Sequence, residues 1–175
     1  MMAAQATELL TSRFRLRPLE VDDVSERYAG WLRNPVAQRF IAAAASAPDL
    51  AALRQYVSER SGREDVLFLG IFDRATGSHL GNIKYEPVDS TAGYAIMGIL
   101  VGEPEWRGKG VAAEVLAASA HWLRKHRNIR QIVLGVQRSN VEAIRAYRKV
   151  GFKDEATPFI PTVSPENLAM VWHLA

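Results

Sequence analysis

Two glycines flank a lysine in the stretch Arg107–Ala112, where an apolar run gives way to a segment with helical periodicity. Glycine permits positive φ and lets the backbone approach a ligand closely. A tight turn at the start of a helix directs several unpaired N–H groups toward one point, with the positive end of the helix dipole behind them. Such a turn binds phosphate oxygens, and the charges of Arg107 and Lys109 favour a polyanionic ligand.

A simpler interpretation is that Gly108 and Gly110 only make a tight strand-to-helix connection, and the glycine pair alone does not separate the two. Spacing does exclude two other phosphate motifs. A nucleotide P-loop requires Ser or Thr after the lysine, but Gly110 follows Lys109. A dinucleotide fingerprint requires a third glycine where this chain has Ala113.

The composition indicates a single globular domain. The chain has 175 residues, 48% of them hydrophobic, a net charge of +3 and no cysteine, which excludes disulfides and thiolate chemistry. We expect a flexible leader over residues 1–12 and one domain over 13–175. Histidine and carboxylate residues do not cluster at ligand spacing, so no metal site is predicted.

The same features limit the partners and the compartment. The excess of basic residues is small and forms no Lys/Arg run, so we expect no nucleic-acid partner. The chain has no signal-peptide pattern and no apolar stretch near the roughly 20 residues that span a bilayer. We therefore expect a cytoplasmic protein without a membrane partner.

Hydrophobic periodicity predicts seven strands and about four helices, which implies a mixed sheet with helices on both of its faces. The Ser139-x-x-Glu142 pattern is typical of a capping box and places the start of the last helix at Asn140. The predicted strands cover a segment from Phe14 that stops at Pro18, 66–72, 80–85 with a continuation to Pro87, 94–101, 132–136, a segment from Phe152 and 168–174. The predicted helices begin near Asp22, Pro48, Lys109 and Asn140.

Two motifs resemble the GNAT family of N-acetyltransferases. Arg107-x-x-Gly110-x-Ala112 matches the R/Q-x-x-G-x-G/A pattern of the family's acetyl-coenzyme A site. Asn140-x-x-Ala143-x-x-x-Tyr147-x-Lys149-x-Gly151-Phe152 is similar to its N-x-x-A-x-x-x-Y-x-K-x-G-F helix. The predicted order of elements is also that of the family, which implies an α/β (α+β) fold with a mixed, mostly antiparallel seven-stranded sheet.

The N-terminal part of the chain adds a finer resemblance. Phe14–Glu20 and Trp31–Pro35 are similar to the branch that includes ribosomal-protein alanine acetyltransferases and acetyltransferases of amino-sugar nucleotides. This resemblance implies a primary amine as acceptor: a protein N-terminus, an amino sugar or another small amine. Segment 34–48 and the loops near Asp89 and 157–165 are expected to choose among these acceptors. Homodimers are common among such relatives.

The resemblance also implies the binding residues for acetyl-coenzyme A. The strand before the turn offers its edge to the pantetheine chain and the thioester, the turn receives the pyrophosphate, and the later helix contacts the pantetheine arm and the thioester sulfur. The residues at these positions are Ile99, Leu100, Val101, Trp106, Arg107, Gly108, Lys109, Gly110, Val111, Ala112, Asn140, Ala143 and Tyr147.

Tyr147 is the candidate catalytic residue, because a neutral phenol with an ordinary pKa of about 10 can protonate the departing thiolate. Alternatively, Tyr147 is an ordinary core residue, because it lies on one buried stripe of the helix with Ile144 and Val150. Glu86 and Asp89 are candidates to receive the acceptor amine or relay its proton, but such residues are commonly solvated turn residues. No general base is assigned. The alternative to an acetyltransferase is a catalytically inactive module that binds acyl-coenzyme A as a sensor or interaction domain.

Overall fold

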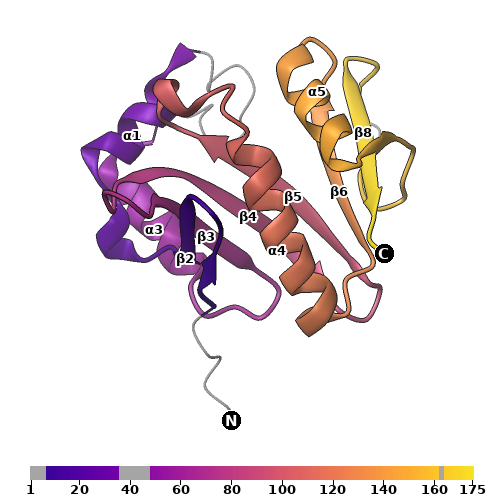
Figure 1. Cartoon of the computed structure of the whole chain (residues 1–175), viewed down its shortest axis with the longest axis horizontal. Helices are drawn as coiled ribbons and strands as arrows, with labels where there is room; N and C mark the ends of the chain where they lie inside the picture. Colours follow the sequence, from indigo (N-terminus) through magenta and orange to yellow (C-terminus); the bar gives the residue numbers. More distant parts are fainter. Residues whose placement is uncertain (1–6, 36–47, 162–163) are drawn as a thin grey trace.

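The computed structural model describes residues 7–35, 48–161 and 164–175. Its centre is an eight-stranded sheet in the order β1-β2-β3-β4-β5-β6-β8-β7 (Figure 1). The predicted mixed, mostly antiparallel sheet is confirmed, since β5 and β6 are its one parallel pair among the described strands. The strands are β1 (Leu9–Leu10), β2 (Phe14–Pro18), β3 (Leu67–Asp73), β4 (His79–Asp89), β5 (Tyr94–Val101), β6 (Gln131–Gln137), β7 (Lys153–Asp154) and β8 (Asn167–His173).

The prediction of seven strands is corrected by β1, which pairs with β2 through Leu9 and Leu10. This pairing also places residues of the expected 1–12 leader in the sheet, before the predicted start of the domain at residue 13. Residues 1–6 lie outside the described part of the chain, as does most of the 34–48 segment that was expected to shape the acceptor site.

Four α-helices are described, and they cover both faces of the sheet as predicted: α1 (Glu26–Arg33), α3 (Leu50–Arg60), α4 (Val111–Arg127) and α5 (Val141–Val150). Strand alternation divides the buried side chains between the faces. Ile83 and Tyr85 of β4 pack in one core with residues of α4 and α5. Phe68 of β3 and Leu100 of β5 pack in a second core with α1 and α3. Figure 1 shows α4 in front of the sheet and α3 behind it.

The two parallel strands at the centre of the sheet pair over a short distance. β5 and β6 share three residue pairs, which end at Ile96 and Val133. Both strands continue beyond this point, β5 to Val101 and β6 to Gln137, and their ends diverge in Figure 1. β6 is paired with β8 along its full length, while β5 keeps its pairing with β4 up to Val101.

Local sequence determines where the two helices beside this divergence begin. Pro104–Trp106 forms a 3-10 turn after β5, and Gly110 in the left-handed region (φ 78°) is the N-cap of α4. The N-cap of α5 is Asn140, whose Oδ1 accepts a hydrogen bond from the Ala143 N–H at 3.4 Å. The predicted capping box at Ser139 is therefore wrong by one residue, because the amide of Asn140 provides the cap in place of the serine hydroxyl.

Candidate functional site

The turn before α4 has the backbone geometry expected of an anion site. Gly108 and Gly110 both have positive φ, at 69° and 78°, which other L-residues rarely adopt. The first amide of α4 that donates to a helical carbonyl is that of Glu114, to Gly110 O at 3.2 Å. The three preceding N–H groups, from Val111 to Ala113, therefore lack an acceptor within the helix. They lie at the positive end of a 17-residue helix, where an anion is stabilised.

The charged side chains of this turn are exposed to solvent. Arg107 and Lys109 are both on the surface, beside the two exposed glycines. Arg107 Nε donates to the carbonyl of Val101 at 3.4 Å, which connects the turn to the end of β5. The turn thus combines two cations with free amides, the pattern that suits a pyrophosphate.

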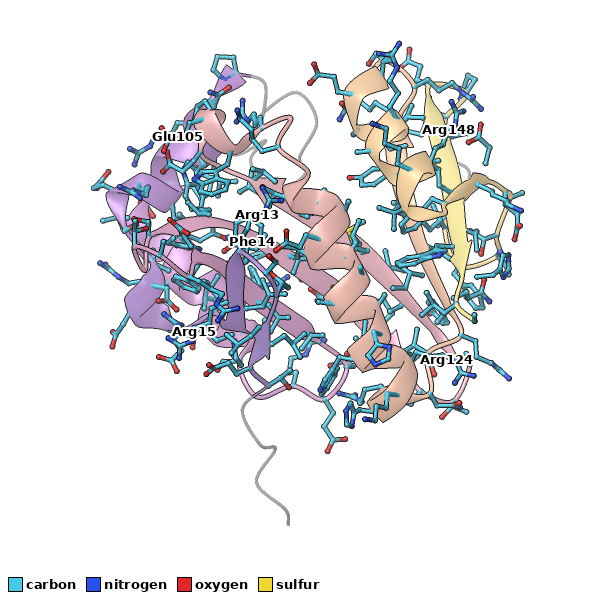
Figure 2. All side chains as sticks on the ribbon, in the orientation of Figure 1. Arg13, Phe14, Arg15, Glu105, Arg124 and Arg148 are labelled. Carbon is cyan, nitrogen blue, oxygen red and sulfur yellow. The ribbon has the colours of Figure 1, made fainter. Side chains whose placement is uncertain are left out.

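The segment between β1 and β2 holds this turn in place, a role that no local sequence pattern indicates. The carboxylate of Glu114 accepts from Arg13 Nε at 2.8 Å and from the Arg13 N–H at 2.9 Å, and it also accepts from the Thr11 hydroxyl. Arg13 Nη1 donates to the carbonyl of Lys109 at 2.9 Å, inside the turn itself. Figure 2 shows Arg13 between β2 and the upper half of α4.

These contacts change the ionisation of Glu114. Burial opposes its charge, but the hydrogen bonds from Thr11 and Arg13 and the charge of Arg13 outweigh it and hold the pKa of Glu114 below its ordinary value. Glu114 is therefore an anion that binds β2 to α4 at neutral pH. No local pattern in the sequence links Arg13 to Glu114, because they lie in distant segments that meet only in the folded chain.

Three residues of the predicted cofactor set lie in the unpaired part of β5. Ile99, Leu100 and Val101 come after the last β5–β6 pair, and each is half-buried. Ile99 and Val101 pack toward the core of α4, while Leu100 packs toward α1 and α3. One edge of this strand is paired with β4, so its other edge presents backbone groups beside the diverging β6.

The remaining predicted residues of the turn have buried or packed side chains. Val111 is buried in the main core, so its backbone N–H is the part available to a ligand. Trp106 packs edge-on against Phe14, with ring centroids 5.4 Å apart, and this contact fixes the 3-10 turn to β2. Ala112 is half-buried at the first turn of α4. The side chain of Trp106 therefore has a packing role that explains its position.

Tyr147 of α5 packs against the same core as Ile99 and Val101. Its ring lies 5.7 Å from that of Phe152, and no hydrogen-bond partner of its hydroxyl is present in the described part of the chain. Burial raises the pKa of Tyr147 to about 12, so the phenol stays protonated near neutral pH. Both the expected neutral state and the alternative packing role are consistent with these contacts.

Asn140 and Ala143 occupy the first turn of α5. Asn140 caps the helix through its Oδ1 and Ala143 supplies the N–H that it accepts, at 3.4 Å. The cap leaves the amide NH₂ of Asn140 available for a second contact. α5 packs against α4, which brings this helix start to the side of the β5–β6 divergence opposite the glycine turn.

The expectation that Glu86 and Asp89 lie just after a central strand is wrong. β4 continues to Asp89 after a register shift between Tyr85 and Val88, so both carboxylates lie within the strand. Glu86 accepts from Arg60 Nε at 2.9 Å and lies 3.3 Å from Lys84 Nζ. Asp89 Oδ1 accepts from the N–H groups of Thr91 and Ala92 and so closes the β4–β5 turn.

The described part of the chain contains neither a metal cluster nor a membrane-spanning helix. Within residues 7–35, 48–161 and 164–175, no group of three or more His, Asp or Glu side chains is placed to hold a metal ion. The helices of these same ranges include none that is long and apolar enough to cross a membrane.

Known proteins resemble this chain in sequence and in fold. Residues 13–153 match a family model described as an acetyltransferase (GNAT) domain. Among solved structures, an acetyltransferase of the GNAT family from Bacillus anthracis superposes with a TM-score of 0.78 at 16% identity, covering 95% of this chain and 98% of that one.

Two structures with bound ligands have the same fold. A spermidine N-acetyltransferase from Vibrio cholerae, in complex with coenzyme A and spermine, gives a TM-score of 0.76 at 18% identity over 93% of this chain and 96% of that one. An aminoglycoside acetyltransferase with coenzyme A and kanamycin gives 0.72 at 22% identity over 91% of this chain and 94% of that one.

Proposed function

This chain belongs to the GNAT acetyltransferase family, and we propose that it moves an acetyl group from acetyl-coenzyme A to a primary amine by direct transfer. The observation that carries the proposal is the pairing of two features around one gap in the sheet. Free amides of the Gly108–Ala113 turn lie at the head of α4, and the edge of β5 from Met97 to Val101 has no partner on β6. The first suits a pyrophosphate, and the second suits an extended chain with amide groups, such as pantetheine.

Each predicted residue then has a defined task. Arg107, Lys109 and the amides from Gly108 to Ala112 bind the pyrophosphate, while the β5 edge at Ile99–Val101 binds the pantetheine arm. Asn140, through its free amide NH₂, adds a polar contact from α5, and Ala143 gives that contact space because its side chain is small. Trp106 supports the turn by packing against Phe14 and is a positioning residue.

The chemistry needs a neutral amine, a stabilised thioester oxygen and a proton for the leaving sulfur. Acetyl-coenzyme A supplies an activated acyl group, whose carbonyl carbon forms a bond to the amine nitrogen as the carbon–sulfur bond breaks. A backbone N–H of β5 near Leu100 stabilises the negative charge that develops on the carbonyl oxygen. Tyr147 donates its proton to the departing sulfur, a role that suits a phenol held neutral by burial. The ammonium loses one proton to solvent before the attack. The nitrogen loses a second proton as the amide forms, and this proton is returned through solvent to the phenolate of Tyr147.

The acceptor is a protein N-terminus, an amino sugar or another small amine. The resemblance of Phe14–Glu20 and Trp31–Pro35 to enzymes that acetylate ribosomal proteins and amino-sugar nucleotides supports this choice. The structural neighbours bind coenzyme A with spermine or kanamycin, which are amines as well.

Two measurements test the proposal. Calorimetry is expected to show binding of coenzyme A, and a thiol-release assay is expected to show acetyl-coenzyme A turnover that depends on an added amine. A Gly110→Val variant, which cannot easily adopt the positive φ of this N-cap, should weaken coenzyme A binding. Binding without turnover across peptides, amino sugars and polyamines would reject the transferase and favour the catalytically inactive module.

A further inference from the structure

The sheet face that carries α1 and α3 is open at Gly98. Gly98 is exposed, and a Cβ built there has no neighbour within 4 Å among the described residues. It lies in the part of β5 that has no partner on β6, directly before Ile99. An amine that reaches this stretch of β5 from the α3 side would therefore pass over Gly98. The residue opposite Gly98 on β4 is Lys84.

Lys84 belongs to a group of four side chains, here named the α3–β4 cluster, with Tyr56 and Arg60 of α3 and Glu86 of β4. Lys84 Nζ donates to the hydroxyl of Tyr56 and lies 3.3 Å from Glu86 Oε2. Arg60 Nε donates to Glu86 Oε2 at 2.9 Å, and its guanidinium lies 3.6 Å from the centroid of the Tyr56 ring. These contacts hold Lys84 in a defined position beside the open space at Gly98.

The cluster holds two cations, Lys84 and Arg60, and Glu59 from outside it lies 3.9 Å from Arg60 Nη1. Glu86 is its one carboxylate, and it is already shared by Arg60, by Lys84 and, at 3.6 Å, by Arg63 from outside the cluster. A polycationic acceptor would therefore meet the ammonium of Lys84 beside a carboxylate that is already occupied, which is unfavourable by Coulomb's law. Lys84 has three N–H donors, of which Tyr56 and Glu86 receive two, and 28% of its side chain is exposed.

We propose that the acceptor amine enters over Gly98 and that the acceptor carries a carboxylate or a phosphate near that amine, which Lys84 recognises. The inference rests on the proposed acetyl transfer and restricts its acceptors to amines that also carry an anionic group. Arg60 and Tyr56 are positioning residues, since they hold Glu86 and Lys84 in place. The charge-assisted hydrogen bond from Lys84 supplies the discrimination.

The test compares acceptors that differ by one anionic group. Glucosamine 6-phosphate is compared with glucosamine for the phosphate, alanine with alaninamide for the carboxylate, and spermidine serves as the polycation. A hydrogen bond to a charged group is worth roughly tenfold to a hundredfold in kcat/KM, so the wild-type protein should prefer one anionic member by at least about tenfold. The pair that shows this preference identifies which anion is bound.

Variants assign the preference to Lys84. Lys84→Met should bring the ratio of kcat/KM within that pair close to one, whereas Lys84→Arg should keep most of it. Lys125→Met, an exposed lysine near the far end of α4, is the matched control and should leave the ratio unchanged. Gly98→Ala should lower kcat/KM for every acceptor, because its methyl group fills the entry space. Calorimetric binding of coenzyme A should stay near the wild-type value in Lys84→Met, Lys84→Arg and Lys125→Met.

The outcomes separate the two proposals. Equal kcat/KM within both pairs, faster acetylation of spermidine, or a preference that survives in Lys84→Met would each overturn this inference while leaving acetyl transfer intact. Coenzyme A binding without turnover of any amine would reject the transferase proposal itself, and the inference with it.

Discussion

Arg13, directly before β2, donates from Nε to Glu114 Oε1 on α4 at 2.8 Å, and the same arginine donates from Nη1 to the carbonyl of Lys109. One side chain thus contacts both the glycine turn and the first turn of the helix behind it. Thr11 adds a hydroxyl to the same carboxylate. The geometry of the glycine turn therefore depends on the segment between β1 and β2 as well as on the local motif.

Replacing Arg13 by Gln should raise the KM for acetyl-coenzyme A by roughly threefold to tenfold and lower the free energy of unfolding by about 1 kcal/mol. Arg15→Gln is the matched control, since Arg15 lies two residues further along the chain but pairs with Glu8 on the surface. Exposed ion pairs contribute about 0–1 kcal/mol, so this control should change little. Steady-state kinetics and urea unfolding measure both quantities, and equal effects of the two variants would contradict the link.

The stabilisation from Glu114 should depend on pH. Its pKa is lowered in the folded state, so its contribution is fully present above the ordinary carboxyl pKa of 4.5 and is lost as pH falls through the folded-state pKa. The difference in unfolding free energy between wild type and Glu114→Gln should be about 1 kcal/mol at neutral pH and should shrink below about pH 4. Urea unfolding across this range measures it. A difference that stays constant with pH would show that the charge is irrelevant.

Tyr147→Phe tests the proposed acid. Phenylalanine keeps the contact with Phe152, so the fold and the KM for acetyl-coenzyme A should change little, while kcat should fall by roughly a hundredfold. The pKa of Tyr147 is raised to about 12, so wild-type kcat should show no decline from deprotonation of this phenol below about pH 11. Full activity of Tyr147→Phe at every pH would remove Tyr147 from the chemistry.

Tyr85 and Ser119 form a buried hydroxyl pair beneath α4, with Oη and Oγ 2.7 Å apart. Ser119 also donates to the carbonyl of Val115 at 2.7 Å. Tyr85→Phe leaves Ser119 with that bond and should cost about 1 kcal/mol, whereas Ser119→Ala leaves a buried phenol without a partner and should cost about 1–3 kcal/mol. Thermal unfolding ranks the two variants, and the opposite order would disprove this reading of the pair.

Two glycines at the end of β5 should respond differently to alanine. A Cβ at Gly102 would lie 2.0 Å from Cδ2 of Trp31, so Gly102→Ala must displace α1 or the tryptophan ring and should cost about 1–3 kcal/mol. At Gly98 the same methyl group meets no described atom, so the unfolding free energy of Gly98→Ala should stay near that of wild type. Chemical unfolding of both variants tests this contrast, and comparable losses would contradict it.

Much of the fold follows from patterns that are local in sequence. β5 has the bounds predicted from its apolar run, Tyr94–Val101, and Gly151 is the C-cap of α5 as a C-terminal glycine should be. The missed features are those without a local pattern. β1 is two residues long and is defined by its pairing, and β4 continues past Pro87 because the register shift after Tyr85 lets pairing resume at Val88.

The same distinction applies to the candidate site, where local motifs can be predicted from the sequence and contacts between distant segments cannot. The glycine turn was recognisable because its residue types and spacing lie within one short stretch. The contacts of Arg13 with Glu114, and of Lys84 with Tyr56, join segments that lie far apart in the chain. Their side chains have ordinary surface-residue types, so the sequence marks none of them as a partner of another.

The short parallel contact between β5 and β6 has a mechanical consequence. Strands β6, β8 and β7 are hydrogen-bonded to β5 through three residue pairs, and they share the main core and the packing of α5 on α4 with the rest of the molecule. A bound chain with amide groups along the free edge of β5 would hydrogen-bond to this edge like an added strand. It would thereby restrict the motion of β6, β8 and β7 relative to the rest of the sheet. Amide hydrogen exchange in β6 and β8 should then slow when coenzyme A is added, even though neither strand belongs to the glycine turn.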